Sequence, residues 1–271
     1  MASPPLIEVN AFTHQGRRRA DNEDSITVGG WVSDVAMSGP RRSRHELTAP
    51  FLVAVADGMG GHAAGEVASR YAIKRLAAEG FAGGDRDVAA TLAAINVELY
   101  DTMAAAPAFR GMGTTAAGLL LTPSQAIWFN LGDSRVYGYL GGRVEHAVIG
   151  ADRIERHVGG RLEQLSVDDV PPGPRSGIIT QCLGGAPTFT RISPHIGARD
   201  LTIPSRWLVC SDGLTDMLDD EVIDRVMEAG DEEAVRHLFT LAMEAGGDDN
   251  VSIIVVSVTP ADSSTTASAG P

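Results

Sequence analysis

The sequence predicts an α+β fold, a β-sandwich of two antiparallel sheets flanked by helix pairs. The expected elements run as strands, two helices, a block of strands, then helices and a final strand. This order differs from the regular strand–helix alternation of α/β proteins. The second observation is that the strands are apolar runs and the helices carry apolar stripes. Packing two sheets between helices would bury both.

Strands are expected where short apolar or alternating runs are bounded by turn residues. The runs predicted as strands are 6–13, 25–28, 51–56, 178–183, 190–196, 206–210 and 251–258. Residues 30–50 are predicted to form a hairpin insertion. The block from 115 to 148 is predicted to be an antiparallel meander, because Pro- and Gly-containing turns divide it into strand-length pieces.

Helices are expected where apolar residues recur at helical spacing. The predicted helices span 63–78, 85–106, 214–218, 220–229 and 231–245. Gly80 is a suitable end for the first helix, and Asp85 a suitable N-cap for the second. Residues 150–177 are predicted to be irregular. The small polar tail 260–271 is expected to be disordered, which leaves one domain over residues 6–259.

The composition limits the possible functions. The chain has 271 residues, of which 44% are hydrophobic and 21% charged, as in ordinary soluble domains. A net charge of −13 argues against a nucleic-acid-binding surface, which requires a basic stripe. Two cysteines do not make a disulfide scaffold, and no apolar run has the length of a signal or membrane segment. We therefore expect a cytoplasmic monomer with no nucleic-acid or membrane partner.

Acidic clusters lie at the ends of five expected strands. The clusters are Asn22-Glu23-Asp24, Asp57, Asp133, Asp212 and Asp248-Asp249. Any one of them could be an ordinary turn with a capping Asp, but a sheet can gather several strand ends into one site. Carboxylates brought together repel one another unless cations neutralise them, and Mg²⁺ or Mn²⁺ suits all-oxygen ligands.

Six motifs occur in an order that resembles a known family. They are Arg19-x-x-Asn22-Glu23-Asp24-Ser25, Ala56-Asp57-Gly58-Met59-Gly60-Gly61-His62, Gly113-Thr114-Thr115, Gly132-Asp133-Ser134-Arg135, Ser211-Asp212-Gly213 and Asp249-Asn250. The chain resembles, from about residue 7 to 258, the bacterial metal-dependent protein serine/threonine phosphatases of type 2C. That family's fold is a β-sandwich flanked by helices, in agreement with the element order.

The resemblance implies a role for each motif residue. Asp57 is similar to the carboxylate that bridges two metals, Mn²⁺ or Mg²⁺. Glu23 and the carbonyl of Gly58 correspond to ligands of one metal, and Asp212 and Asp249 to ligands of the other.

Further residues correspond to supporting positions. Asp133 resembles the residue that holds a third metal together with Asp212. Asp24 and Asn250 correspond to residues behind the ligands, and Arg19 to the phosphate-binding arginine. His62 is either a proton donor to the leaving group or a surface turn histidine.

The implied activity is hydrolysis of phosphoserine and phosphothreonine by in-line attack of a metal-bridging hydroxide. Phosphoprotein substrates and a cognate Ser/Thr kinase are the expected partners. The alternative is a catalytically weak scaffold that binds phosphoproteins or a kinase through the same fold. A cysteine-based phosphatase is disfavoured because the sequence has no Cys-x5-Arg motif.

The segment 150–177 departs from the family pattern, because the usual Asp-His-Ser-like turn is not recognisable. We expect this segment to set substrate choice and to be mobile without a partner. Its acids, including Asp168 and Asp169, should favour phosphosites flanked by Lys or Arg. The alternative is a passive surface loop.

Overall fold

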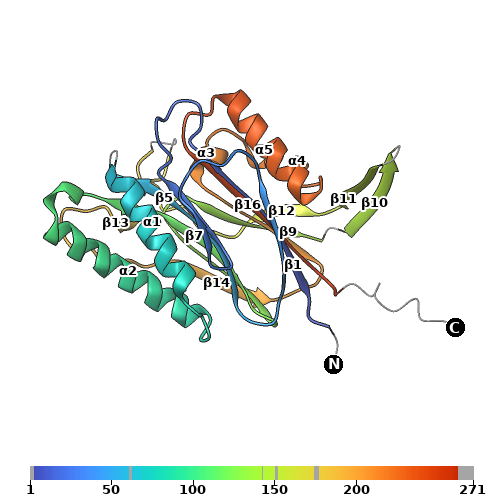
Figure 1. Cartoon of the computed structure of the whole chain (residues 1–271), viewed down its shortest axis with the longest axis horizontal. Helices are drawn as coiled ribbons and strands as arrows, with labels where there is room; N and C mark the ends of the chain where they lie inside the picture. Colours follow the sequence, from blue (N-terminus) through green and yellow to red (C-terminus); the bar gives the residue numbers. More distant parts are fainter. Residues whose placement is uncertain (1–2, 61–62, 142, 150–151, 174–176, 262–271) are drawn as a thin grey trace.

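The computed structural model describes residues 3–60, 63–141, 143–149, 152–173 and 177–261. Two antiparallel sheets pack face to face, and helices cover the outer face of each sheet (Figure 1). The predicted α+β sandwich is confirmed. No helix in these ranges is both long enough and apolar enough to cross a membrane.

The first sheet has six strands. In spatial order they are β12 (Arg161–Gln164), β9 (Arg135–Leu140), β15 (Ser205–Cys210), β16 (Val251–Thr259), β1 (Leu6–His14) and β4 (Arg41–Glu46). Its outer face packs against α3 (Asp212–Thr215), α4 (Asp220–Val226) and α5 (Asp231–Ala245).

The second sheet lies on the other side of the central core. Its main path, in spatial order, is β13 (Leu183–Gly184), β6 (Gly113–Thr114), β5 (Phe51–Met59), β7 (Ala116–Leu121), β8 (Gln125–Leu131) and β14 (His195–Asp200). Beside this path, β2 (Asp24–Val28) pairs with β5 and with β3 (Trp31–Ser33). The outer face is covered by α1 (Ala63–Ala78) and α2 (Asp85–Ala105), and a 3-10 turn, η1 (Pro107–Phe109), follows α2.

A separate two-stranded hairpin lies in the chain between β9 and β12, the neighbouring strands at one edge of the first sheet. Its strands are β10 (Arg143–Ile149) and β11 (Asp152–Val158), which pair only with each other among the described strands. Figure 1 shows this hairpin extending away from the sandwich.

The four-layer arrangement explains why the central strands are apolar without interruption. In β5, Val53 and Val55 belong to the core between the sheets, whereas Leu52, Ala54 and Ala56 face α1 and α2. Successive side chains of a strand point to opposite faces, so a strand covered on both faces must be apolar at every position.

Two predicted hairpin arrangements are wrong because neighbouring segments belong to different sheets. In 30–50, β3 pairs with β2 whereas β4 pairs with β1. In the block 115–148, β8 belongs to the second sheet and β9 to the first. The chain crosses over at Gly132, whose φ of 99° suits glycine, and this crossing places Asp133 at the rim of the sandwich.

Three local predictions also need correction. The strand expected at 190–196 begins at His195, directly after Pro194, which cannot donate a ladder hydrogen bond. The strand expected at 178–183 is reduced to Leu183–Gly184. The segment 150–177 contains β11 and β12 and is therefore not irregular. Residues 262–271, most of the predicted tail, lie outside the described residues.

Candidate active site

The acidic clusters meet at one rim of the sandwich, where β2 and β5 lie side by side. Asp24 and Asp57 are direct partners in this pairing. A cavity of about 390 Å³ opens at this point. Its walls include all but one of the predicted metal ligands: Glu23, Asp57, Gly58, Asp212 and Asp249. The predicted phosphate-binding Arg19 lines the same cavity.

The backbone of Asp57 is fixed by the two threonines that precede β7. The Asp57 N–H donates to Oγ1 of Thr115 (3.0 Å), and the Asp57 carbonyl accepts from the Thr115 N–H (2.9 Å) and from Oγ1 of Thr114 (2.8 Å). Thr115 Oγ1 also lies 2.7 Å from Oγ of Ser134. The carboxylate at the end of β5 is thereby linked to the loop that carries Asp133.

The residue after Asp57 must be glycine because α1 begins directly behind it. A Cβ added to Gly58 would lie 2.3 Å from the carbonyl oxygen of Gly65. A Cβ on Gly65 would in turn lie 2.5 Å from Oε2 of Glu23. These close backbone approaches hold the end of β5, the start of α1 and Glu23 together.

The carboxylates strongly perturb one another. Burial raises the pKa of Asp57 well above its usual value, and the charges of Asp212 and Asp24 raise it further. Burial and the charge of Asp133 raise the pKa of Asp212 to about 8. Ionised carboxylates buried side by side repel one another. Such a group therefore tends to bind protons or cations, which remove the repulsion.

The donor set fits hard divalent cations. Oδ1 of Asp212 and Oδ1 of Asp133 are buried and accept no hydrogen bond from the described residues. Such oxygens are available as ligands, and carboxylate and carbonyl oxygens suit Mg²⁺ and Mn²⁺. Among the described residues no three His, Cys, Asp or Glu side chains already surround a single ion position. The carboxylates therefore line a shared cavity and do not enclose one point.

Asp133 lies in a second pocket that adjoins the first. This pocket is also lined by Asp168, Asp216 and Asp212, and Asp212 lines the first cavity as well. Burial raises the pKa of Asp133 to about 6, with Asp168 and Asp216 adding to the shift. The structure thus brings Asp133 and Asp212 together, as the third-metal interpretation requires.

Arg19 lies at the mouth of the first cavity, with its side chain 56% exposed. Its Nη2 donates to Oδ2 of Asp249 at 2.6 Å. The preceding Arg18 pairs with Asp248 at 2.7 Å. Two successive arginines therefore face two successive aspartates, and only Arg19 reaches the carboxylate that lines the cavity.

Asn250 supports the loop that carries Glu23. Its Oδ1 accepts from the Glu23 N–H (2.7 Å), and its Nδ2 donates to the carbonyls of Gln15 (3.0 Å) and Asp21 (2.9 Å). Asn250 is 4% exposed. Asn250 therefore lies behind Glu23, where the resemblance places a supporting residue.

Asp24 is buried behind the cavity and held by two serines: Ser211, whose motif was recognised without a role for the serine, and Ser252, which was not singled out. Its Oδ2 accepts from Oγ of Ser211 (2.7 Å) and Oγ of Ser252 (2.6 Å). Burial raises the pKa of Asp24 to about 7, although both hydroxyls oppose the shift. The signal was present, since Ser211 directly follows the apolar run 207–210 and Ser252 interrupts the apolar run 251–256. His62, the predicted proton donor, lies outside the described residues.

Two acids of segment 150–177, Asp168 and Asp169, are bonded inside the molecule, contrary to expectation. Arg135 donates to both oxygens of Asp168 (3.1 and 2.7 Å). Asp169 accepts from the N–H of Gly132 (2.9 Å), and its Oδ1 lies 2.9 Å from Nε2 of His195. These carboxylates are not free charges that could select basic phosphosites.

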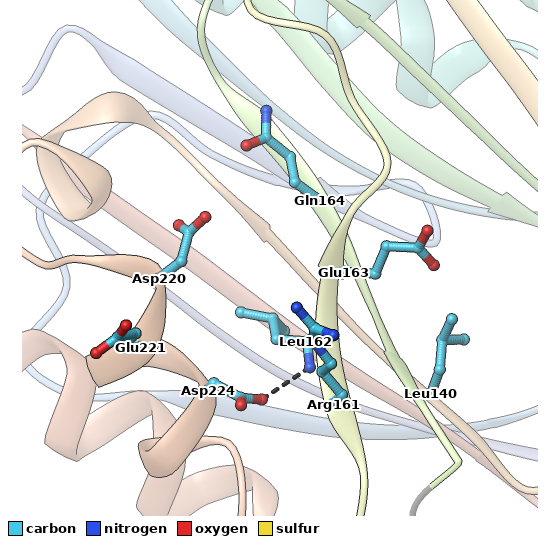
Figure 2. Close-up of a pocket in the computed structure, with 8 residues that line it drawn as sticks. All are labelled: Leu140, Arg161, Leu162, Glu163, Gln164, Asp220, Glu221 and Asp224. Carbon is cyan, nitrogen blue, oxygen red and sulfur yellow. Dashed lines mark hydrogen bonds between the residues drawn. The ribbon is translucent and has the colours of Figure 1, made fainter.

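An acid-lined pocket of about 610 Å³ lies between β12 and α4, as Figure 2 shows. Asp224 of α4 accepts from the Leu162 N–H of β12 at 2.7 Å. Asp220 accepts from the hydroxyl of Tyr137 at 2.9 Å. These bonds attach α4 to the first sheet, so Asp220 and Asp224 have a structural role.

Comparison with known proteins gives a consistent result. The family model described as "Protein phosphatase 2C" matches residues 42–243. The serine/threonine protein phosphatase PstP of Mycobacterium tuberculosis is 30% identical over 263 residues, which is 95% of this chain. The match covers 46% of PstP, so the chain spans about half the length of that relative.

Two further comparisons cover nearly the whole of both chains. The protein phosphatase PhpP of Streptococcus pneumoniae is 28% identical over 94% of this chain and 99% of its own length. The crystal structure of the catalytic domain of PstP with two manganese ions superposes with a TM-score of 0.69. That comparison shows 29% identity and covers 94% of this chain and 99% of the other.

Proposed function

Because the chain belongs to the protein phosphatase 2C family, we propose that it is a metal-dependent phosphatase of phosphoserine and phosphothreonine in proteins. One observation carries the proposal. Asp57, Asp212 and Asp249 converge with Arg19 on a single cavity. Without bound cations or protons, the carboxylates in this cavity would strongly repel one another.

We propose Mn²⁺ or Mg²⁺ as the cofactor, with two ions and a third in the adjoining pocket. Glu23, Asp57 and the carbonyl of Gly58 would hold one ion, and Asp57, Asp212 and Asp249 the other. Asp133 and Asp212 would hold the third. When bound, such ions lower the pKa of a water and neutralise the charge of the phosphoryl group.

The chain's own residues supply binding and orientation. The Arg19 guanidinium at the cavity mouth can bind phosphate oxygens bidentately, in exchange for its bond to Asp249. Thr115 and Asn250 hold the backbones of Asp57 and Glu23, so the carboxylates keep their positions when substrate arrives. We retain His62 as a candidate proton donor.

The proposed partners are phosphoprotein substrates and a cognate Ser/Thr kinase, and we propose that the protein acts as a monomer in the cytoplasm. The free thiols of Cys182 and Cys210 agree with a reducing compartment. The scaffold alternative is less well supported, because every carboxylate that the resemblance assigns to a metal lines either the cavity or the adjoining pocket.

The test is hydrolysis of a small aryl phosphate with Mn²⁺, with and without excess chelator. We expect activity that chelator removes and added Mn²⁺ restores. The Asp57→Asn variant should lose nearly all turnover and should bind Mn²⁺ much more weakly by calorimetry. Wild-type turnover by this variant at saturating Mn²⁺ would contradict the metal assignment.

A further inference from the structure

A groove of about 690 Å³ lies close to the proposed active site and is not used by the chemistry described above. We call it the aromatic groove. It runs between the end of α2 at Tyr100 and Met103, the glycine Gly111, and the loop Gly185–Phe189.

The aromatic groove presents apolar surface to solvent. Phe189 is 53% exposed, and its ring packs edge-on against Tyr100 with the centroids 5.2 Å apart. Because this ring lies in a groove beside Tyr100 and Met103, a ligand's apolar side chain could bury area against several groups at once. All the residues that line the groove are among those that the structure describes.

The walls of the groove are fixed by hydrogen bonds from α2. The Tyr100 hydroxyl donates to the carbonyl of Gly184 (3.1 Å). Asn96 accepts from the Gly184 N–H (2.9 Å) and donates to the carbonyl of Thr190 (2.9 Å). The loop that carries Phe189 is therefore held at both ends, and the groove is formed before any ligand binds.

The aromatic groove adjoins the active-site cavity through glycine backbone. Gly60 lines the cavity and Gly111 lines the groove. A Cβ added to Gly60 would lie 2.6 Å from the Gly111 carbonyl oxygen, so the two backbones are in contact. A polypeptide that leaves the cavity over this rim meets the groove next.

The strand register gives the distance between the two sites. Met59 of β5 is opposite Gly113 of β6, and Gly113 is opposite Gly184 of β13. Figure 1 shows β13 beyond β5, beside the end of α2. Two strand spacings are about 10 Å, which an extended chain covers in about three residues.

We propose that the aromatic groove binds a large apolar side chain of the phosphoprotein substrate, about three residues from the phosphorylated residue. This inference rests on the proposed phosphatase function and adds a determinant of substrate choice. Continuity with the cavity favours the substrate polypeptide over an unrelated partner. The determinant lies in 185–189 and α2, and not in Asp168 and Asp169, whose carboxylates are bonded inside the molecule.

The test uses phosphothreonine peptides that differ only in Leu or Ser at the third residue on either side. Burial of one leucine side chain predicts a kcat/KM about tenfold higher for one of the two Leu peptides. The Phe189→Ala variant should lose this preference, and Phe189→Leu should keep most of it. Val35→Ala, at another exposed apolar residue (61% exposed), is the matched control and should behave as wild type.

A small aryl phosphate tests the phosphatase function separately from the role of the groove, because it is too short to reach the groove. All variants should hydrolyse it at the wild-type rate. Two results would overturn the proposed role of the groove and leave the phosphatase function intact. One is wild type that hydrolyses aryl phosphate but shows no preference for Leu, and the other is a Phe189→Ala variant that keeps the preference. If aryl phosphate is not hydrolysed at all, the function fails. Peptide binding measured by NMR shift changes at Phe189 then still decides whether the groove prefers Leu.

Discussion

At the scale of single residues, hydroxyl and amide groups determine where the carboxylates lie. Thr115 holds Asp57, Ser211 holds Asp24, and Asn250 holds the Glu23 backbone. Each of these groups is buried, so its hydrogen bonds do not compete with water. Like-charged side chains are kept together because the backbones of Asp57 and Glu23 and the carboxylate of Asp24 are fixed from behind.

Arg19→Ala should raise KM for phosphosubstrate much more than it lowers kcat. An arginine fork contacts phosphate in the ground and transition states alike, so its loss is mainly a loss of uniform binding. Steady-state kinetics on aryl phosphate measures the separation of the two constants.

Arg17→Ala and Arg18→Ala are the matched controls for this prediction. Arg18 pairs with Asp248, which does not line the cavity. Equal effects from all three substitutions would indicate a diffuse basic patch and no specific phosphate contact.

At the scale of elements, Asp169 connects loops from separate parts of the fold. Its carboxylate accepts from Gly132, next to Asp133, and contacts His195 at the start of β14. Its carbonyl accepts from the Thr180 N–H at 2.7 Å, at the end of the segment 177–179 that lines the cavity. The segment expected to be a free loop is therefore a connection between the two pockets and the second sheet.

Asp169→Asn should destabilise the protein by about 1–3 kcal/mol, because one of the two carboxylate oxygens that accept hydrogen bonds is lost from a side chain that is only 11% exposed. We also expect a lower kcat/KM, since Gly132 and Thr180 position both pockets. Urea unfolding and aryl phosphate kinetics measure the two effects. Glu163→Gln, an exposed acid on β12, is the control. Equal stability of the two variants would contradict the role of Asp169.

Replacing 161–175 with a Gly/Ser linker tests whether this segment is structural or sets substrate choice. The replacement removes β12 from the sheet and removes Asp168 from Arg135. We expect activity to be lost on both aryl phosphate and phosphopeptides. Loss on phosphopeptides alone would instead support the original idea of a specificity loop.

At the scale of the whole molecule, a net charge of −13 is combined with a rim where several acids share one cavity. The sheets hold this rim in place because both are covered by helices and buried on both faces. The stable fold therefore holds the acids of the rim close together despite their mutual repulsion, and bound protons or cations can relieve this repulsion.

The metal-free protein should become less stable as pH rises from about 5 to about 8.5. The pKa values of Asp133, Asp24 and Asp212 are raised to about 6, 7 and 8 in the folded protein. The folded state therefore binds protons more tightly than the unfolded state. This stabilisation is complete at low pH and is lost as pH rises through the raised values.

Thermal unfolding across this pH range, with and without Mn²⁺, measures the effect. The increase in Tm caused by Mn²⁺ should be larger at pH 8.5 than at pH 5.5, and Asp57→Asn should reduce it. A metal-free Tm that rises steadily through this window would contradict the prediction.

The sequence by itself determined the fold class, the ordered motifs and the residues at the rim. Doubly buried strands must be apolar throughout and end at polar residues, so Phe51–Ala56 and Asp57 could be recognised from composition along the chain. The tertiary structure alone decided which strands pair and which acids are already bonded. The sheet that a strand joins depends on contacts between segments distant in sequence, because β8 pairs with β14 in the second sheet whereas β9 pairs with β15 in the first. The partners of Asp168 and Asp169 come from β9, the Gly132 turn and β14, so no local pattern distinguishes these bonded carboxylates from free surface charges.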